Sequence, residues 1–163
     1  MTYTPKGDSL ITASKDETIL VWAHPARIKD GYKLTSRLKG HMAPALGVCV
    51  HPTGLLMATC SCDQTAVLWS VPDEGKMGEA RDQDWQSVST ILGHGDYVKG
   101  VSFRDDGRML ATASRDKTVR LWATPARPRG AHARALFCLD RSVPRGWSIV
   151  LECKVVPSRR KFV

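Results

Sequence analysis

Short runs of apolar and β-branched residues, separated by polar turns, recur along the first 123 residues of the chain. The run Met109 to Ser114 is followed by Thr118 to Ala123, and only Arg115 to Lys117 separate them. Two such runs joined by three residues predict a tight antiparallel β-hairpin.

Further runs of this kind flank the hairpins and extend each unit to four short strands. The strands expected before the hairpins are Ala45 to Pro52 and Tyr97 to Arg104, and the outer strands are Tyr32 to Leu38 and Ser87 to Leu92. One such sheet cannot bury both of its faces alone, so the units are expected to stack.

Three segments of the chain place the same residue types at the same offsets. Each begins with Gly, has Asp nine residues later and ends with Trp fifteen residues later: Gly7 to Trp22, Gly54 to Trp69 and Gly107 to Trp122. Two of them follow a Gly-His pair, Gly40-His41 and Gly93-His94. The tryptophans are 47 and 53 residues apart, slightly more than the roughly 40 to 45 residues of a four-stranded propeller repeat.

The joint spacing of His, Thr, Asp and Trp resembles the WD-repeat β-propeller family over about residues 1–123. The Asp that usually follows the Trp is replaced by Ala23, Ser70 and Ala123. The resemblance implies an all-β fold of β-propeller blades, each a four-stranded antiparallel sheet. About two and a half to three units are expected, at residues 1–38, 39–92 and 93–123, followed by a non-repeat basic tail at 124–163.

A closed propeller needs at least about four blades. The first unit lacks most of its innermost strand, and the third has no convincing outer strand. The chain is therefore expected to be a fragment or an incomplete gene model of a larger propeller, or to complete its ring with another chain.

Composition agrees with an intracellular globular protein. Apolar residues make up 42% of the chain and charged residues 25%, which is ordinary for a globular domain. The N-terminus has no signal-peptide pattern, and no run reaches the roughly 18 apolar residues of a membrane span. The five cysteines are odd in number, which favours reduced thiols in the cytoplasm or nucleus.

The net charge of +8 is concentrated at the C-terminal end. Residues 1–123 carry 15 Lys and Arg against 14 Asp and Glu, whereas residues 124–163 carry 9 against 2. This tail also contains four prolines, and a basic, proline-containing segment is expected to be flexible. Its stretch Trp147 to Val156 has enough Val, Ile and Leu to add one strand.

The repeated polar residues include the types found in a catalytic hydroxyl, base and acid triad. In the family they form a structural hydrogen-bond network, and repetition in every blade argues against a unique active site. The predicted structural tetrads are His41, Thr59, Asp63 and Trp69, then His94, Thr112, Asp116 and Trp122, with Thr12, Asp16 and Trp22 in the first unit. We therefore predict no catalytic residues and no cofactor.

Cys49, Cys60 and Cys62, with His51 close by, raise the alternative of a metal site. Zinc sites typically have two residues between paired cysteines, whereas Cys60 and Cys62 form a C-x-C expected inside a strand. Packing is the expected role of Cys60, and no metal site is predicted.

The family resemblance also implies a partner-binding face, formed by the loops entering the inner strands and by the hairpin turns. The positions carried over are Lys15, Pro44, Leu46, Cys62, Tyr97, Lys99 and Arg115. An aromatic residue among three cations suits a peptide with acidic or phosphorylated side chains. The alternative is an ordinary solvated rim.

Residues 71–86 hold five acidic and two basic residues and lengthen the second unit. They are expected to form a protruding loop on the opposite face, because insertions in loops cost little stability. Trp85 either begins the outer strand or is an exposed contact for a partner.

The sequence thus predicts a non-catalytic protein-interaction scaffold or adaptor within a multiprotein complex. The partners expected are proteins or peptides, with self-association or completion of the propeller by another chain as an alternative. Other functions left open are a nucleic-acid-associated protein that uses the basic tail, and a regulatory propeller of a larger enzyme. No membrane association is expected.

Overall fold

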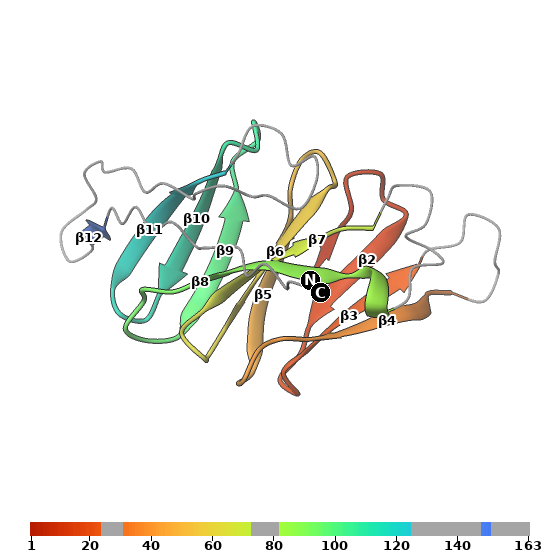
Figure 1. The fold of residues 1–163 in the computed structure, drawn as a ribbon, viewed down its shortest axis with the longest axis horizontal. Coiled ribbons are helices and arrows are strands. Elements are labelled where there is room, and N and C mark those ends of the chain that lie inside the picture. The colour runs from red at the N-terminus through yellow and green to blue at the C-terminus, as the bar shows by residue number, and fades with distance from the viewer. Residues whose placement is uncertain (24–30, 73–81, 125–147, 151–163) are drawn as a thin grey trace, which may run out of the picture.

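The computed structural model of the protein describes residues 1–23, 31–72, 82–124 and 148–150. Within these ranges the chain forms three four-stranded sheets that lie side by side (Figure 1). The sheets have the strand orders β1-β2-β3-β4, β5-β6-β7-β8 and β9-β10-β11-β12. The prediction of an all-β fold of incomplete propeller blades is confirmed.

The strand bounds follow the repeats of the sequence. The first sheet consists of β1 (Thr2–Tyr3), β2 (Ser9–Ala13), β3 (Thr18–Ala23) and β4 (Lys33–Lys39). The second consists of β5 (Ala45–Val50), β6 (Leu56–Ser61), β7 (Ala66–Ser70) and β8 (Gln86–Ile91). The third consists of β9 (Val98–Phe103), β10 (Met109–Ser114), β11 (Thr118–Ala123) and β12 (Ser148–Val150). A 3-10 helix, η1 (Asp82–Asp84), precedes β8.

The hairpin turn between the second and third strand of each sheet explains why the sequence repeats Asp-x-Thr. The x residues of this motif, Glu17, Gln64 and Lys117, adopt positive φ angles of 72°, 70° and 68°. A positive φ is expected for the last residue of a three-residue hairpin loop. The preceding Asp supports this turn by accepting a hydrogen bond from the Thr backbone, for example from Thr118 N–H to Asp116 Oδ1 at 2.8 Å.

The third sheet differs from the expected antiparallel blade at its outer edge. β9, β10 and β11 pair antiparallel, but β12 pairs parallel with β11. The strand Ser148–Val150 lies within the predicted stretch 147–156, whose other residues lie outside the described ranges. Its parallel direction means that it does not form the outer strand in the way that β4 and β8 do in the first and second sheets.

Two further details differ from the sequence-based expectations. Cys62 lies in the turn after β6 and not inside the strand, because β6 ends at Ser61. Trp85 comes directly before β8 and is buried among the core residues between the first two sheets, so it is not an exposed contact. Most of the insertion, residues 73–81, lies outside the described residues.

The core lies between neighbouring sheets. Ile11, Ile19 and Val21 of the first sheet pack with Met57 and Trp69 of the second in one buried cluster. On the other face of the second sheet, apolar residues pack against the third sheet in another cluster, which includes Ala58, Cys60, Leu68, Leu110 and Trp122. In both junctions, the sheet face that carries the repeat Trp is covered by the preceding sheet.

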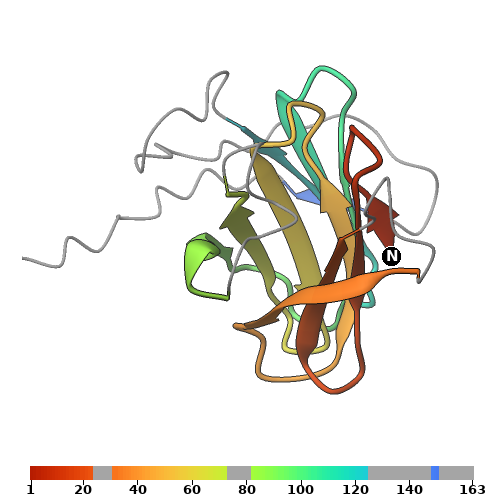
Figure 2. The same cartoon turned by 90° about the vertical axis from the view of Figure 1, so that its right-hand side faces the viewer.

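The equivalent Trp-bearing face of the first sheet is open in the part of the chain that the structure describes. Tyr3, Leu10, Trp22 and Leu34 are paired in one row across β1, β2, β3 and β4. No other sheet covers this row within the described residues (Figure 2). Trp22 is only partly buried, and Leu34 is 39% exposed, whereas Trp69 and Trp122 are 3% and 2% exposed.

Candidate functional site

The predicted functional residues gather at one edge of the three sheets. The turns β2–β3, β6–β7 and β10–β11 lie along this edge, together with the segments that enter β5 and β9 (Figure 1). In the second and third sheets, a repeated serine ties the turn to the segment that enters the inner strand of the same sheet. Ser61 Oγ donates to the carbonyl of Ala43 at 2.8 Å, and Ser114 Oγ to that of Asp96 at 2.9 Å.

The tetrad of the second sheet forms a continuous chain of hydrogen bonds below this edge. Trp69 Nε1–H donates to Thr59 Oγ1 at 2.9 Å, and Thr59 Oγ1 lies 2.8 Å from His41 Nε2. His41 Nδ1 lies 2.8 Å from Asp63 Oδ2. The hydroxyl therefore accepts the indole N–H, and the imidazole of His41 bridges the hydroxyl to the carboxylate.

The third sheet repeats this arrangement almost atom for atom. Trp122 Nε1–H donates to Thr112 Oγ1 at 3.0 Å, and His94 joins Thr112 and Asp116 with two contacts of 2.8 Å. In the first sheet, Trp22 donates to Thr12 at 3.1 Å. Asp16 there accepts from Thr18 within its own turn.

The geometry of the tetrads does not suit nucleophilic catalysis. A catalytic hydroxyl must reach a substrate, but Thr59 and Thr112 are 0% exposed. Each hydroxyl also accepts the indole N–H. The close packing extends to Gly40, because a Cβ there would lie 2.6 Å from Trp69 Cη2.

The acidic ends of the tetrads are held in their ionised form. Burial raises the pKa of Asp63, but hydrogen bonds from Thr65, the Met42 N–H and His41 outweigh burial, so the pKa lies below its ordinary value. The same balance lowers the pKa of Asp116, whose hydrogen bonds come from Thr118, the Gly95 N–H and His94. Both carboxylates thus link a hairpin turn to the loop before the inner strand.

The cysteines of the second sheet lie in an apolar environment. Desolvation raises the pKa of both Cys49 and Cys60 to about 12, so these thiols stay protonated and weakly nucleophilic at neutral pH. In the described ranges, no three His, Cys, Asp or Glu residues are grouped so that they could hold a metal ion.

The residues predicted for the partner-binding face lie on the turns and strand entries of this edge. Lys15, Leu46, Tyr97, Lys99 and Arg115 are exposed, and Pro44 and Cys62 are half-buried. Backbone hydrogen bonds join Cys62 N–H to the Pro44 carbonyl at 3.0 Å and Arg115 N–H to the Tyr97 carbonyl at 2.9 Å. We call these seven residues the turn face.

Arg115 is positioned by two neighbours on the turn face. Its guanidinium carbon lies 5.6 Å from the centre of the Tyr97 ring, within the range of a cation–π contact. Its Nε lies 3.6 Å from Asp96 Oδ2. Asp96 therefore offsets part of the positive charge that the sequence places here.

Two residues at the edges of the sheets were not predicted from the sequence to have a role. Met42 follows the Gly-His pair and is 88% exposed beside the turn face, while its N–H donates to Asp63 Oδ2 at 3.0 Å. His51 was considered only as a metal ligand, yet it is buried and joins the second sheet to the third. The buried carbonyl that His51 contacts is 56 residues away in the sequence.

No helix in the described part of the chain has the length and apolar character needed to cross a membrane.

Comparisons with known proteins agree with this architecture. The family profile "WD domain, G-beta repeat" matches residues 32–70 and 85–123. Each match begins with or just before the outer strand of one sheet, β4 or β8, and continues through the three inner strands of the next. The sequence repeat is therefore offset by one strand from the structural blade.

Curated relatives share the same pattern over part of their length. The chain is 32% identical over 124 residues to nuclear distribution protein nudF 1 of Talaromyces marneffei, which covers 75% of this chain and 24% of that protein. It is 26% identical over 138 residues to a subunit of chromatin assembly factor 1 of Mus musculus, covering 75% and 22%. It is 36% identical over 125 residues to probable cytosolic iron-sulfur protein assembly protein 1 of Candida glabrata, covering 75% and 36%.

The chain thus spans about a quarter of the length of the first two relatives. Two profile matches, three stacked four-stranded sheets and the repeated tetrads agree with one another. This chain belongs to the WD-repeat β-propeller family.

Proposed function

We propose that the protein is a non-catalytic scaffold or adaptor that binds other proteins within a multiprotein complex. The main support is the turn face, where exposed side chains from neighbouring blades are carried on short turns fixed by hydrogen bonds. Such rigid positioning reduces the conformational entropy lost when a partner binds. The names of two relatives, one a component of an assembly factor and the other an assembly protein, are consistent with this role.

The partner proposed for the turn face is a peptide with acidic or phosphorylated side chains. The observation that carries this proposal is Arg115, whose guanidinium lies over the Tyr97 ring at 5.6 Å. A guanidinium can form paired hydrogen bonds with a carboxylate or phosphate while its plane stacks on an aromatic ring. Lys99, exposed on the adjacent strand β9, adds a second positive charge.

A non-enzymatic role is supported by the burial of the only triad-like groups in the described residues. Thr59 and Thr112 are both inaccessible to a substrate. The names of relatives refer to the nucleus, to chromatin and to the cytosol, which supports a location in the cytoplasm or the nucleus. The alternative of nucleic-acid binding rests on the basic tail, which lies outside the described residues apart from Thr124 and 148–150.

The proposal can be tested by charge reversal on the turn face. The double variant Lys99→Glu, Arg115→Glu should lose binding to an acidic or phosphorylated peptide, and the affinity of the unaltered chain should fall as salt is added. The matched control is Lys33→Glu, Arg108→Glu, which also reverses one exposed Lys and one exposed Arg, at the opposite edge of the sheets. Circular dichroism should be the same for both variants.

Fluorescence anisotropy with labelled peptides measures the affinities. If both double variants bound the peptide with equal affinity, the interaction would have to lie outside the turn face. Binding that disappears only when residues 125–163 are deleted would favour the nucleic-acid or tail-mediated alternative.

A further inference from the structure

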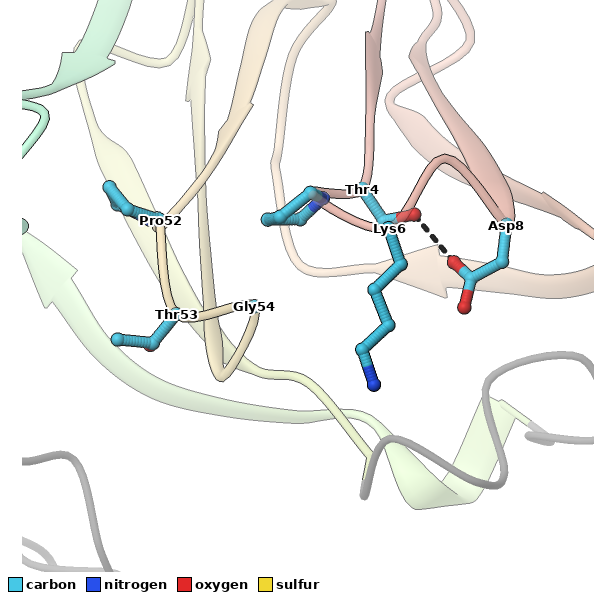
Figure 3. A pocket seen from close by; sticks show the side chains of 7 residues that line it. Thr4, Lys6, Asp8, Pro52, Thr53 and Gly54 are labelled. Atoms are coloured by element: carbon cyan, nitrogen blue, oxygen red, sulfur yellow. Dashed lines mark hydrogen bonds between the residues drawn. The ribbon is translucent and has the colours of Figure 1, made fainter.

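A small cavity lies at the edge of the sheets opposite the turn face. It has a volume of about 150 Å³ and lies between the β1–β2 turn and the β5–β6 turn (Figure 3). The β1–β2 turn supplies Thr4, Lys6 and Asp8, and the β5–β6 turn supplies Pro52, Thr53 and Gly54. The cavity therefore lies at the junction between the first and second blades.

At the equivalent place between the second and third blades, the imidazole ring of His51 fills the space. His51 Nε2–H donates to the carbonyl of Gly107 at 2.9 Å, and His51 Nδ1 accepts from Thr53 Oγ1 at 2.7 Å and from Thr53 N–H at 3.1 Å. The edge-to-face contact with Phe103 has a centroid distance of 5.0 Å. Both ring nitrogens of His51 are thus paired, Nε2 as a donor and Nδ1 as an acceptor.

The residue at the position of His51 in the first blade can be identified from the sequence repeat. His51 lies three residues before Gly54, and Thr4 lies three residues before Gly7. Gly54 is likewise the counterpart of Gly107. Thr4 therefore occupies, in the first blade, the position from which His51 reaches the third blade.

Thr4 turns back into its own hairpin and does not fill the junction. Its hydroxyl donates to Asp8 Oδ1 at 2.5 Å and accepts from Ser9 N–H at 3.1 Å. The surroundings of the two equivalent glycines show the difference in space. A Cβ on Gly107 would lie 2.2 Å from His51 Nε2, whereas the atom nearest to a Cβ on Gly54 would be Pro5 Cδ, at 3.9 Å.

We propose that this cavity binds an imidazole ring, which donates its N–H to the carbonyl oxygen of Gly54. A protein cavity of about 150 Å³ can hold a benzene-sized ring, and imidazole is smaller. The rings of Pro5 and Pro52 provide apolar walls, and the Asp8 carboxylate beside Thr4 favours a ligand that carries N–H donors. Two sources offer this chemistry: a histidine side chain of a partner peptide, or a small molecule with a free imidazole.

The site is independent of the turn face, because it is built from other turns at the opposite edge. The second blade supplies its own imidazole, His51, at the equivalent position beside Gly107, and the first blade does not.

The test is a titration of the full 163-residue chain, followed through the backbone amide signals of Thr4, Asp8 and Gly54 by NMR. Imidazole should shift these signals in a saturable way. 1-Methylimidazole has the same ring but no N–H donor, so it should bind at least tenfold more weakly. The variant Thr4→His should supply the missing ring from within the chain and abolish the response to imidazole.

A peptide, acetyl-Ala-His-Ala-amide, distinguishes the two sources. Tighter binding of the peptide than of imidazole assigns the site to a histidine-bearing partner, and binding of imidazole alone assigns it to a small molecule. The proposal is overturned if imidazole causes no saturable shift, if 1-methylimidazole binds equally well, or if Thr4→His, with an unchanged circular dichroism spectrum, still responds.

Discussion

His51 in the second blade donates a hydrogen bond to the carbonyl oxygen of Gly107 in the third blade, across a distance of 2.9 Å. This contact joins two sheets that share no strand pairing. Gly107 has a φ of +68°, and any Cβ there would overlap the His51 ring. The junction therefore depends on both residues.

Gly107→Ala should destabilise the protein more than Gly54→Ala. Both glycines have positive φ angles, +68° and +76°, so both substitutions carry the left-handed penalty of about 1 to 2 kcal/mol. Only Gly107→Ala also collides with His51, which should add about 1 to 3 kcal/mol. Urea unfolding of the two variants measures the difference, and equal midpoints would contradict the inter-blade role of His51.

Asp116→Ala should lower stability by about 1 to 3 kcal/mol, because it leaves buried hydrogen-bond donors without their acceptor. Asp16→Ala is the matched control. Asp16 makes the same turn contacts with Thr18, so the excess loss in Asp116→Ala reports the contacts of Asp116 with His94 and with the Gly95 N–H. Thermal melts in which the two variants lose the same amount would reject a stabilising role for the His94–Asp116 pair.

Acid should destabilise the folded chain in a defined window. The pKa values of Asp63 and Asp116 are lower in the folded state than the ordinary value of 3.8. Their contribution to the free energy of unfolding is therefore complete above about pH 4 and is lost as the pH falls from there through the folded-state pKa values. Melting temperatures between pH 6 and pH 2 measure this loss.

Asp63→Asn and Asp116→Asn should each flatten that pH dependence, since neither side chain then titrates. An unchanged pH profile in the double variant would assign the acid sensitivity to other carboxylates, such as Asp106, whose pKa is lowered to about 2 by Arg104.

The isolated 163-residue chain should self-associate. The open face of the first blade presents Tyr3 and Leu34, which are 54% and 39% exposed, and contiguous exposed apolar surface favours association. Leu34→Glu should therefore shift the sedimentation coefficient toward that of a monomer. Leu92→Glu changes another exposed leucine, outside that row, and should have no such effect. A compact monomer at every concentration of the unaltered chain would contradict this prediction.

The sequence by itself determined the contacts within each blade. The offset between Thr59 and Trp69 equals that between Thr112 and Trp122, and both pairs form the same hydrogen bond. The antiparallel register pairs Thr59 with Val67 and Thr112 with Arg120, which makes each Trp a diagonal neighbour of its Thr. The Asp-x-Thr turn is also local, so its geometry repeats wherever the motif does. These features were predictable because few residues, all close in sequence, decide them.

Only the tertiary structure decided the contacts between blades. Trp22 and Trp69 occupy the same repeat position, yet one is partly exposed and the other buried. Among the described residues, a preceding sheet covers Trp69 and none covers Trp22. Thr4 and His51 likewise share a position, but only the imidazole is long enough to reach the next blade. Stacking places residues side by side that are some fifty positions apart, and no local pattern encodes which neighbour each will meet.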